Sequence, residues 1–519
     1  MNHGGASDPR GREITGPQLR PSAPVGKIWR DRATWVVRGV GPPTVPIAVP
    51  GHHDDVSQQQ ARSVLDLALR IGEASLSTGA SAAEVVATVI RVTAAFEIRS
   101  TSVDITYTSV SVSMQRGVNE DPLTVMRVIK DQSMDFTRLE ALQFLVDELC
   151  GTPDRTWTRG HDGEWTAADQ VSVEEARTKL SDILTAPHPY RRWVVTVGMA
   201  VTAIGVVIIF GAGPTMWVVA GLSAAAVDRA QRVLYRMGVA SFFSQAVSAA
   251  IPSLIAVALF WISSPSNSSS GLPGLGLDIP GLTTPSLVVV SGIIVLLAGL
   301  SVMGAAQDAL DGYYVTAGAR GLEVVMMTLG IAVGVAIVLS GANAAGVSLI
   351  IQPDVGERTS LVPGVIGAIV VAIGFCMTHY TGLRATLVSA SLAALAWLTF
   401  QGATVANLGQ APASAVAAIA VGAFAYTVHH RLRVPELAIS TAAIVALLPG
   451  FAVYRAIFLV MLDSSEFLNL ATLEMLTALA VGLGLAAGMS IGGYAARRRF
   501  GLDRPALRAR RRSFGVYRD

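Results

Sequence analysis

The sequence predicts a mainly α-helical protein that crosses a membrane about ten times, preceded by a small cytoplasmic α+β domain. Three observations predict this class. Hydrophobic residues make up 51% of the 519 residues and charged residues 15%, whereas soluble domains carry about 25% charged residues. The deficit of charge is confined to the chain after Trp193, where ten apolar segments follow one another. One apolar hairpin is also present twice, at an offset of about 150 residues, which is typical of membrane proteins built by duplication.

The chain before these segments divides into a tail and a domain. Residues 1–56 carry Pro, Gly and scattered charge without periodicity, which predicts a disordered tail. Nothing around His52 to Asp55 fixes a coordination geometry, so we expect no metal site and no cofactor. Residues 57–190 form the predicted α+β domain.

This predicted domain shows signals of helix starts and of a strand pair. Ser57, Ser81 and Ser172 are typical N-cap residues, and each opens a predicted helix. Val103 to Met114 alternate in polarity with one change of phase, which predicts a bulge or turn within a strand pair. The domain has no nucleophile elbow, zinc-ligand spacing or P-loop. These features favour a gating, docking or regulatory role over a catalytic one.

Several of the apolar segments approach the length of about 20 residues that a helix needs to cross a bilayer. The ten segments are residues 193–211, 214–227, 240–262, 285–306, 321–341, 361–378, 384–400, 411–428, 435–460 and 472–495. The second and seventh are short, which indicates helices that are broken, tilted or extended by polar turns.

The duplicated hairpin defines two halves of the membrane part. Each copy opens with Pro-x-Leu, reaches a helix-loosening position at Gly299 or at Pro449-Gly450, and restarts at Leu-Glu. We therefore predict a first repeat of five helices in residues 191–345 and a second in residues 360–497. A basic cytoplasmic tail, residues 498–519, follows the second repeat.

Arginines recur in every second connection, for example at Arg229, Arg320 and Arg431. The positive-inside rule then places both termini in the cytoplasm. Because each half has an odd number of spans, the two repeats are inverted, as in many secondary transporters. The net charge of +2 is too small to indicate a nucleic-acid partner.

Four acidic residues are candidates for proton coupling, since ionisable groups in apolar runs are costly and default to functional hypotheses. Glu323 and Glu474 are repeat-related; the alternative is a first-turn acid that interacts with the helix dipole. Asp308 follows the fourth segment, and the alternative to a coupling role is that it is an ordinary acid in a loop. Asp228 ends the short second segment, where it could pair with Arg229 or line the cytoplasmic mouth.

The candidate substrate site lies at the two helix breaks. Arg455 follows Pro449-Gly450 within the ninth segment, where an unpaired Arg costs at least about 2.5–3.5 kcal/mol near mid-membrane. Either the segment ends before Arg455, or Arg455 faces a wet cavity and can hold a carboxylate bidentately. Gly299, Pro449 and Gly450 would free backbone groups to bind substrate.

The chain also resembles the bacterial threonine/serine exporters. The resemblance rests on Ser77-Thr-Gly-Ala-Ser81 followed by Glu84, on the strand from Tyr107 to Ser113, and on Val434-Pro435-Glu436-Leu437 leading to Leu447-Leu448-Pro449-Gly450. It implies a soluble amino-terminal domain, about ten spans in a bacterial plasma membrane, and export of threonine and serine driven by the proton motive force. Relatives split over two chains are implicated in dicarboxylate export.

Three hypotheses follow. The first is a proton-coupled threonine and serine exporter in the lipid bilayer, in which Arg455 binds the substrate carboxylate and Glu323 or Glu474 the ammonium; homo-oligomer formation stays open. The second is an exporter of another small metabolite, such as a dicarboxylate. The third is a membrane-anchored, hydrolase-like enzyme that uses residues 57–187.

Overall fold

The computed structural model describes residues 57–98, 101–115, 121–129, 133–150, 157–159, 165–167, 171–263, 286–296, 299–347, 361–432, 434–461 and 465–499. The predicted tail, residues 1–56, lies outside the described residues together with its His52 to Asp55 cluster. Most of the basic tail, residues 500–519, lies outside them too. The described residues all belong to one compact unit, residues 44–519.

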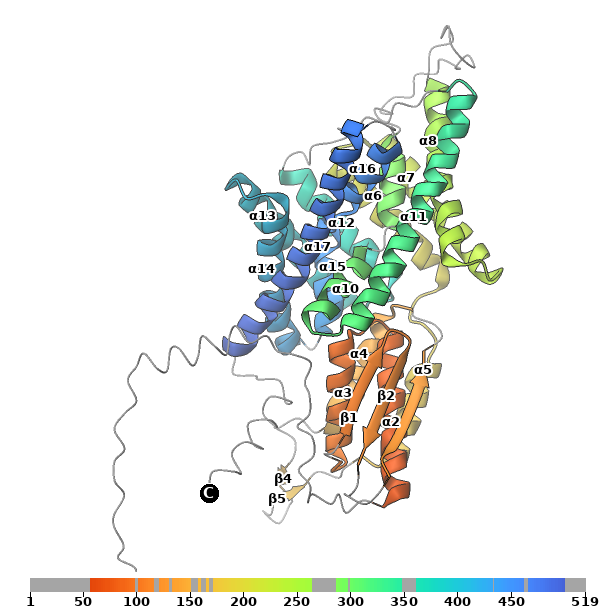
Figure 1. Ribbon diagram of the computed structural model, residues 1–519. Helices are drawn as coiled ribbons and strands as arrows, with labels where there is room; N and C mark the ends of the chain where they lie inside the picture. Colours follow the sequence, from red (N-terminus) through yellow and green to blue (C-terminus); the bar gives the residue numbers. More distant parts are fainter. Residues whose placement is uncertain are drawn as a thin grey trace, which may run out of the picture. The chain divides into compact units, whose positions relative to one another are not determined.

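The N-terminal domain is a three-stranded antiparallel sheet covered by helices (Figure 1). Its elements are α2 (Gln58–Ser77), α3 (Ala82–Ala95), β1 (Thr101–Thr106), β2 (Ser109–Met114), β3 (Leu123–Val128), α4 (Phe136–Cys150), β4 (Trp157–Arg159), β5 (Trp165–Ala167) and α5 (Val173–Thr185). The predicted N-caps are confirmed. The hydroxyls of Ser57, Ser81 and Ser172 each accept a hydrogen bond from the backbone N–H of the residue three positions later. The change of phase in the strand pair is a turn between β1 and β2, at Tyr107 and Thr108.

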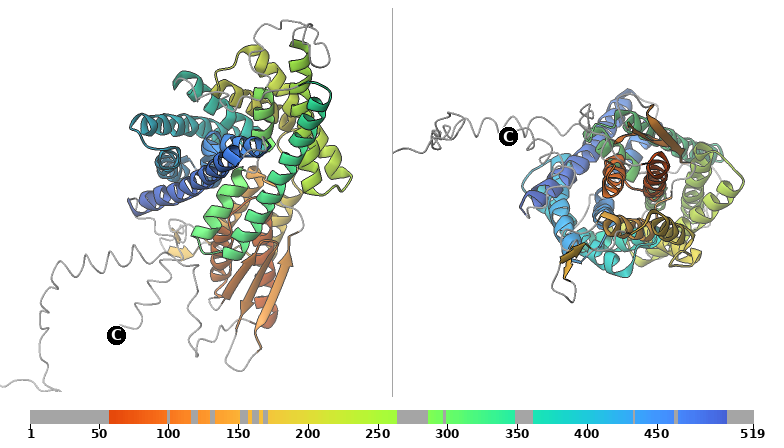
Figure 2. Two further views of the ribbon diagram at one scale, coloured as in Figure 1. Left: turned by 45° about the horizontal axis from the view of Figure 1, so that its top comes forward. Right: turned by 90° about the horizontal axis from the view of Figure 1, so that it is seen from below.

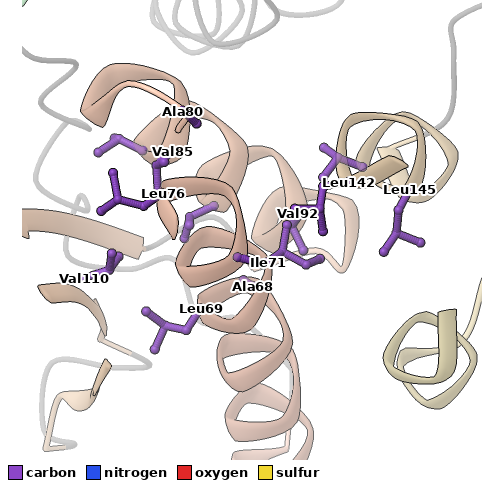
Figure 3. Packing of buried hydrophobic residues seen from close by; sticks show 14 of the residues in the cluster. Ala68, Leu69, Ile71, Leu76, Ala80, Val85, Val92, Val110, Leu142 and Leu145 are labelled. Carbon is purple, nitrogen blue, oxygen red and sulfur yellow. The ribbon is translucent and has the colours of Figure 1, made fainter. Parts of the chain in front are cut away.

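An apolar core joins this domain to the membrane helices. Leu76, Val85 and Leu142 belong to the cluster drawn in Figure 3. The same cluster continues into buried Phe375 and Ala438, which lie on two of the helices that follow. The domain therefore packs directly on the helical part of the chain.

Every predicted apolar segment falls on a helix or on a broken helix. These are α6 (Arg192–Ile209), α7 (Pro214–Arg236), α8 (Ser241–Ser263), α9 (Ser286–Leu296), α10 (Gly299–Leu310), α11 (Tyr314–Ala344), α12 (Leu361–Thr378), α13 (Leu383–Val405), α14 (Gln410–Leu432), α15 (Glu436–Ile444), η1 (Val445–Leu447), α16 (Gly450–Met461) and α17 (Ser465–Arg499). Within the described ranges, seven helices are long and apolar enough to cross a membrane, and the bent pair α9 and α10 raises this to eight. The chain is a multi-pass membrane protein of mainly helical fold.

Several helices are longer than the apolar segments that predicted them. The short second and seventh segments belong to α7 and α13, each of 23 residues. Helices α11 and α17 span 31 and 35 residues and are the two long helices seen in green-to-teal and dark blue in Figure 2. Both begin before the predicted apolar segments, at Tyr314 and Ser465.

Glycines bring α6 and α12 into close contact. A Cβ on Gly205 would lie 2.9 Å from the carbonyl oxygen of Gly367, and a Cβ on Gly367 would lie 2.7 Å from that of Gly205. Gly198 and Gly374 make the same reciprocal approach, at 2.9 and 2.7 Å. The contacts advance along α6 while they retreat along α12, so these two helices run antiparallel.

The packing pairs among α6 to α11 resemble those among α12 to α17. Helix α6 packs on α7, α8 on α11, and α10 on α11; in the second half, α12 packs on α13, α14 on α17, and α16 on α17. The pairs α8–α11 and α14–α17 both approach through glycines: a Cβ on Gly334 would lie 2.0 Å from a carbonyl of α8, and one on Gly488 would lie 2.4 Å from a carbonyl of α14.

Candidate functional site

A cavity of about 240 Å3 lies where the N-terminal domain meets α10, α11 and α15; we call it the seam cavity. Its polar lining includes Ser77, Ser81 and Tyr107 from the domain, and Ser301, Gln307, Arg320, Glu323 and Thr441 from the membrane helices. Two of these residues, Arg320 and Glu323, carry opposite charges and lie on α11.

The predicted acid Asp308 lies on α10 beside this cavity. Its side chain is fully buried, and its Oδ2 lies 2.9 Å from Nη1 of Arg320 in an ion pair. The approach is not aligned as a hydrogen bond. The backbone N–H of Ala82, at the start of α3, donates to Oδ1 at 3.4 Å. The alternative that Asp308 is a loop acid is therefore wrong, because α10 extends to Leu310 and the domain covers its end.

The predicted acid Glu323 contacts the N-terminal domain. The phenol of Tyr107 donates a short hydrogen bond to Oε2 of Glu323. Burial, reinforced by that hydrogen bond and by the charge of Glu323, raises the pKa of Tyr107 above its ordinary value. The phenol keeps its proton at physiological pH and links the turn between β1 and β2 to α11.

The structure pairs the two predicted residues of the second repeat with each other. Nη1 of Arg455 on α16 lies 3.2 Å from Oε1 of Glu474 on α17. Their side chains are 28% and 19% exposed, so the pair is largely enclosed. Arg455 lies within a helix rather than beyond the end of one, and the pairing explains how its charge is tolerated.

Neither of the two predicted glutamates, Glu323 and Glu474, is a first-turn acid. Glu323 is the tenth residue of α11 and Glu474 the tenth residue of α17. The macrodipole interaction falls off within the first turn, so the helix-dipole alternative is wrong for both. Each instead contacts a neighbouring element through its side chain.

Asp228 belongs to a separate cluster between α6 and α7. Its Oδ2 accepts a hydrogen bond from the hydroxyl of Thr196 at 2.7 Å and one from Arg232 at 2.7 Å. Its partner is thus Arg232, one helical turn away, and not the predicted Arg229. Asp228 does not border the seam cavity.

Both predicted helix breaks are present. Gly299 is the first residue of α10, and α9 and α10 are bent by 43°. Pro449 separates η1 from α16, which begins at Gly450. Arg455 lies in the second turn of α16, and α9 packs against α16. The two broken helices therefore contact each other through α9 and α16.

Sequence reasoning missed Arg320 and Tyr107. The positive-inside pattern treats Arg320 as a loop charge, although its spacing of three residues from Glu323 places both on one helix face. Tyr107 was interpreted as a strand residue, and no local pattern predicts that its phenol reaches a helix more than 200 residues later in the chain.

The domain also contacts the connection between α12 and α13. The N–H of Phe136 donates to the carbonyl of His379 at 3.1 Å, and His188 stacks on Tyr380 with ring centroids 4.5 Å apart. Burial lowers the pKa of His379 to about 4, against a smaller opposing effect of its hydrogen bond to the carbonyl of Phe375. His379 is therefore neutral at physiological pH.

Broken helices with ion-paired acids beside them, in a multi-pass helical protein, are typical of membrane transporters. Comparison with protein families makes this specific. The family model described as "Putative threonine/serine exporter" matches residues 66–156 and 164–341, and the one described as "Threonine/Serine exporter, ThrE" matches residues 364–493. The chain belongs to the threonine/serine exporter family, a family of transporters rather than enzymes.

Two relatives cover most of the chain. A Mycobacterium tuberculosis protein named "Probable threonine/serine exporter" is 33% identical over 463 residues, which cover 87% of this chain and 80% of that protein. A Corynebacterium glutamicum protein named "Threonine/serine exporter" is 29% identical over 465 residues, which cover 88% and 86%. No solved structure matches the chain.

Proposed function

We propose that this protein exports threonine and serine from the bacterial cytoplasm across the plasma membrane, driven by the proton motive force. The observation that carries the proposal is the presence, in both halves, of a repeat-related glutamate beside a broken helix and near a guanidinium. Arg320 and Asp308 form the ion pair in the first half, and Arg455 and Glu474 in the second. The names of the relatives support the substrate class.

The proposal includes two inverted repeats of five helices. Support comes from the glycines of α6 and α12, which occupy the seventh and fourteenth positions of both 18-residue helices. Each seventh-position glycine meets the fourteenth-position glycine of the other helix: Gly198 meets Gly374, and Gly205 meets Gly367. A two-fold axis relating the helices requires such reciprocity. The second family model, which begins at residue 364, supports a boundary between the halves.

In this proposal, substrate passes between the two ion-paired regions. An amino acid carries both charges, so it can replace the partners of an ion pair, with its carboxylate on Arg455 and its ammonium on Glu474. Gly299, Pro449 and Gly450 place backbone polar groups near that path. Glu323, Glu474 and Asp308 are the candidate proton carriers; Asp228 is a weaker one, because its carboxylate is held by Arg232 away from the cavity.

Flux into inside-out vesicles tests the proposal. Labelled threonine and serine should accumulate in vesicles when the interior is acidic, and collapse of the pH gradient should stop the accumulation. Movement of succinate without threonine would instead establish a dicarboxylate exporter. Glu323→Gln and Glu474→Gln should each alter the pH dependence; if neither does, the glutamates are not the proton carriers.

Orientation belongs to the same proposal. We place both termini in the cytoplasm. Arg229, Arg232 and the basic residues after α17 then all lie on the cytoplasmic side, as the positive-inside rule requires. Cysteines introduced at the chain ends should react with an impermeant maleimide in inside-out vesicles and not in intact cells. The reverse pattern would invert the topology.

A further inference from the structure

We propose that the seam cavity is a binding site for a zwitterionic α-amino acid, built jointly by the N-terminal domain and α10, α11 and α15. This inference rests on the proposed export function and adds the place where the substrate binds before it enters the membrane. It also gives the N-terminal domain a direct part in substrate recognition.

The two charges that an α-amino acid needs lie together in the cavity wall. Arg320 and Glu323 are three residues apart on α11, so both face the same side of the helix. Fully buried Asp308 fixes the guanidinium of Arg320 at 2.9 Å through Nη1. A guanidinium has five N–H donors in a fork that matches a carboxylate, so Arg320 can hold Asp308 and a substrate carboxylate together. The carboxylate of Glu323 is then the partner for the ammonium.

The charge of the cavity selects against dianions. Asp308, Arg320 and Glu323 together carry a net charge of −1, and their side chains lie in the seam between two packed parts of the chain. A zwitterion leaves this charge unchanged. A dicarboxylate would add two negative charges near the carboxylates of Glu323 and Asp308, with the single guanidinium of Arg320 to offset them, and like charges at short distance repel. The geometry therefore favours an amino acid over a dicarboxylate.

The size and lining of the cavity suit a small hydroxylated substrate. Its volume of about 240 Å3 is below the range of about 300–1,000 Å3 typical of pockets for drug-sized ligands. Ser77, Ser301 and Thr441 contribute hydroxyl groups and Gln307 an amide. These groups can exchange hydrogen bonds with the side-chain hydroxyl of serine or threonine.

The segments that carry the family resemblance meet at this cavity. Ser77, Gly79 and Ser81 come from the first segment, Tyr107 begins the second, and Leu437 ends the Val-Pro-Glu-Leu stretch. These segments are far apart in the sequence, and the fold brings all three to the same cavity. Tyr107 orients Glu323 through its hydrogen bond, which makes it a positioning residue.

Transport kinetics in proteoliposomes test the assignment. Arg320→Lys keeps the charge that Asp308 requires and removes the fork, and Glu323→Gln removes the charge for the ammonium; each should raise KM for serine about tenfold. Tyr107→Phe should raise KM about threefold while Vmax stays within about twofold. The matched control is Tyr314→Phe, a tyrosine that is 75% exposed at the start of α11, and its KM should equal that of the wild type.

Protection from chemical labelling gives a readout that does not depend on transport. In a chain with Cys150→Ser, the remaining native Cys376 is fully buried. A cysteine introduced by Ser301→Cys should react with a small maleimide in the purified protein, and serine should slow the reaction. Ethanolamine, which lacks the carboxylate, and 3-hydroxypropionate, which lacks the ammonium, should protect at least about tenfold less well.

The outcomes separate this inference from the export function. If the wild type transports serine but all three variants keep its KM, the seam site is overturned and the export function stands. The same conclusion follows if serine does not protect the introduced cysteine. Absence of serine and threonine transport in the wild type would overturn the export function itself. Equal protection by serine and 3-hydroxypropionate would exclude Glu323 as the ammonium partner and so refute the zwitterion site.

Discussion

The ion pair between Arg455 and Glu474 makes the most direct test of how the second half tolerates a charged residue inside a helix. Glu474→Gln removes the negative charge and keeps the shape, so Arg455 loses its counter-charge. Breaking a fully buried pair costs about 3–5 kcal/mol, whereas an exposed pair contributes about 0–1 kcal/mol. Because the two side chains are 28% and 19% exposed, we expect a loss of about 2–3 kcal/mol.

The assay is a double-mutant comparison of thermal midpoints in detergent. Arg455→Gln and Glu474→Gln should each lower the midpoint of unfolding, and the double variant should recover at least half of the summed loss, because it leaves no charge without its partner. The charge-reversed variant, Arg455→Glu with Glu474→Arg, should recover more. Additive losses in the double variant would refute the reasoning, since they would mean that the two charges do not interact.

Three further predictions concern packing and charge elsewhere in the fold. Gly205→Val should lower the thermal midpoint, because its side chain would meet α12 at less than 3 Å and overpacking costs about 1–3 kcal/mol or more; Gly402→Val, on a position with nothing within 4 Å, should not. Because the pKa of His379 is lowered to about 4, its neutral form stabilises the fold fully above the ordinary pKa of about 6.5. That contribution, at most about 3 kcal/mol, should be lost as the pH falls from about 6.5 to 4. Over that range, the thermal midpoint of His379→Gln should therefore fall less than that of the wild type. Asp228→Asn should cost about 1–3 kcal/mol, as expected for lost hydrogen bonds to a charged group, while exposed Arg229→Gln should stay within about 0.5 kcal/mol.

Much of the fold could be predicted because it depends on local signals. Serine hydroxyls that cap helices, as at Ser57 and Ser81, act within three residues of themselves. Apolar runs identify helices, because a helix satisfies its own backbone polar groups within lipid. Hydropathy does not locate helix ends, so the predicted segment begins at residue 321 although α11 begins at Tyr314. The first turns of α11 pack on β1, where the hydroxyl of Thr316 donates to the carbonyl of Ile105 at 3.5 Å.

Some residues of the candidate site can be selected from the sequence, and their pairing cannot, for the same physical reason. The high cost of a charge in an apolar run identified Glu323, Glu474 and Arg455 without any knowledge of their neighbours. Which charges pair is a property of tertiary packing. Arg455 reaches Glu474 because α16 packs on α17, and no spacing in the sequence encodes that contact.

Comparison of the two predicted repeats explains why the sequence does not indicate Arg320. At the offset of 151 residues that relates Glu323 to Glu474, the counterpart of Arg455 is Gly304. A Cβ on Gly304 would lie 3.0 Å from Nη1 of Arg320, so the guanidinium of Arg320 fills the space above that glycine. In the proposed repeat, the first half supplies its positive charge from Arg320 on α11 and the second half from Arg455 on α16. The two ion pairs join α10 to α11 and α16 to α17, but the arginine comes from the second helix of the first pair and from the first helix of the second pair. A comparison made position by position along the sequence therefore finds the glutamates and not the arginines.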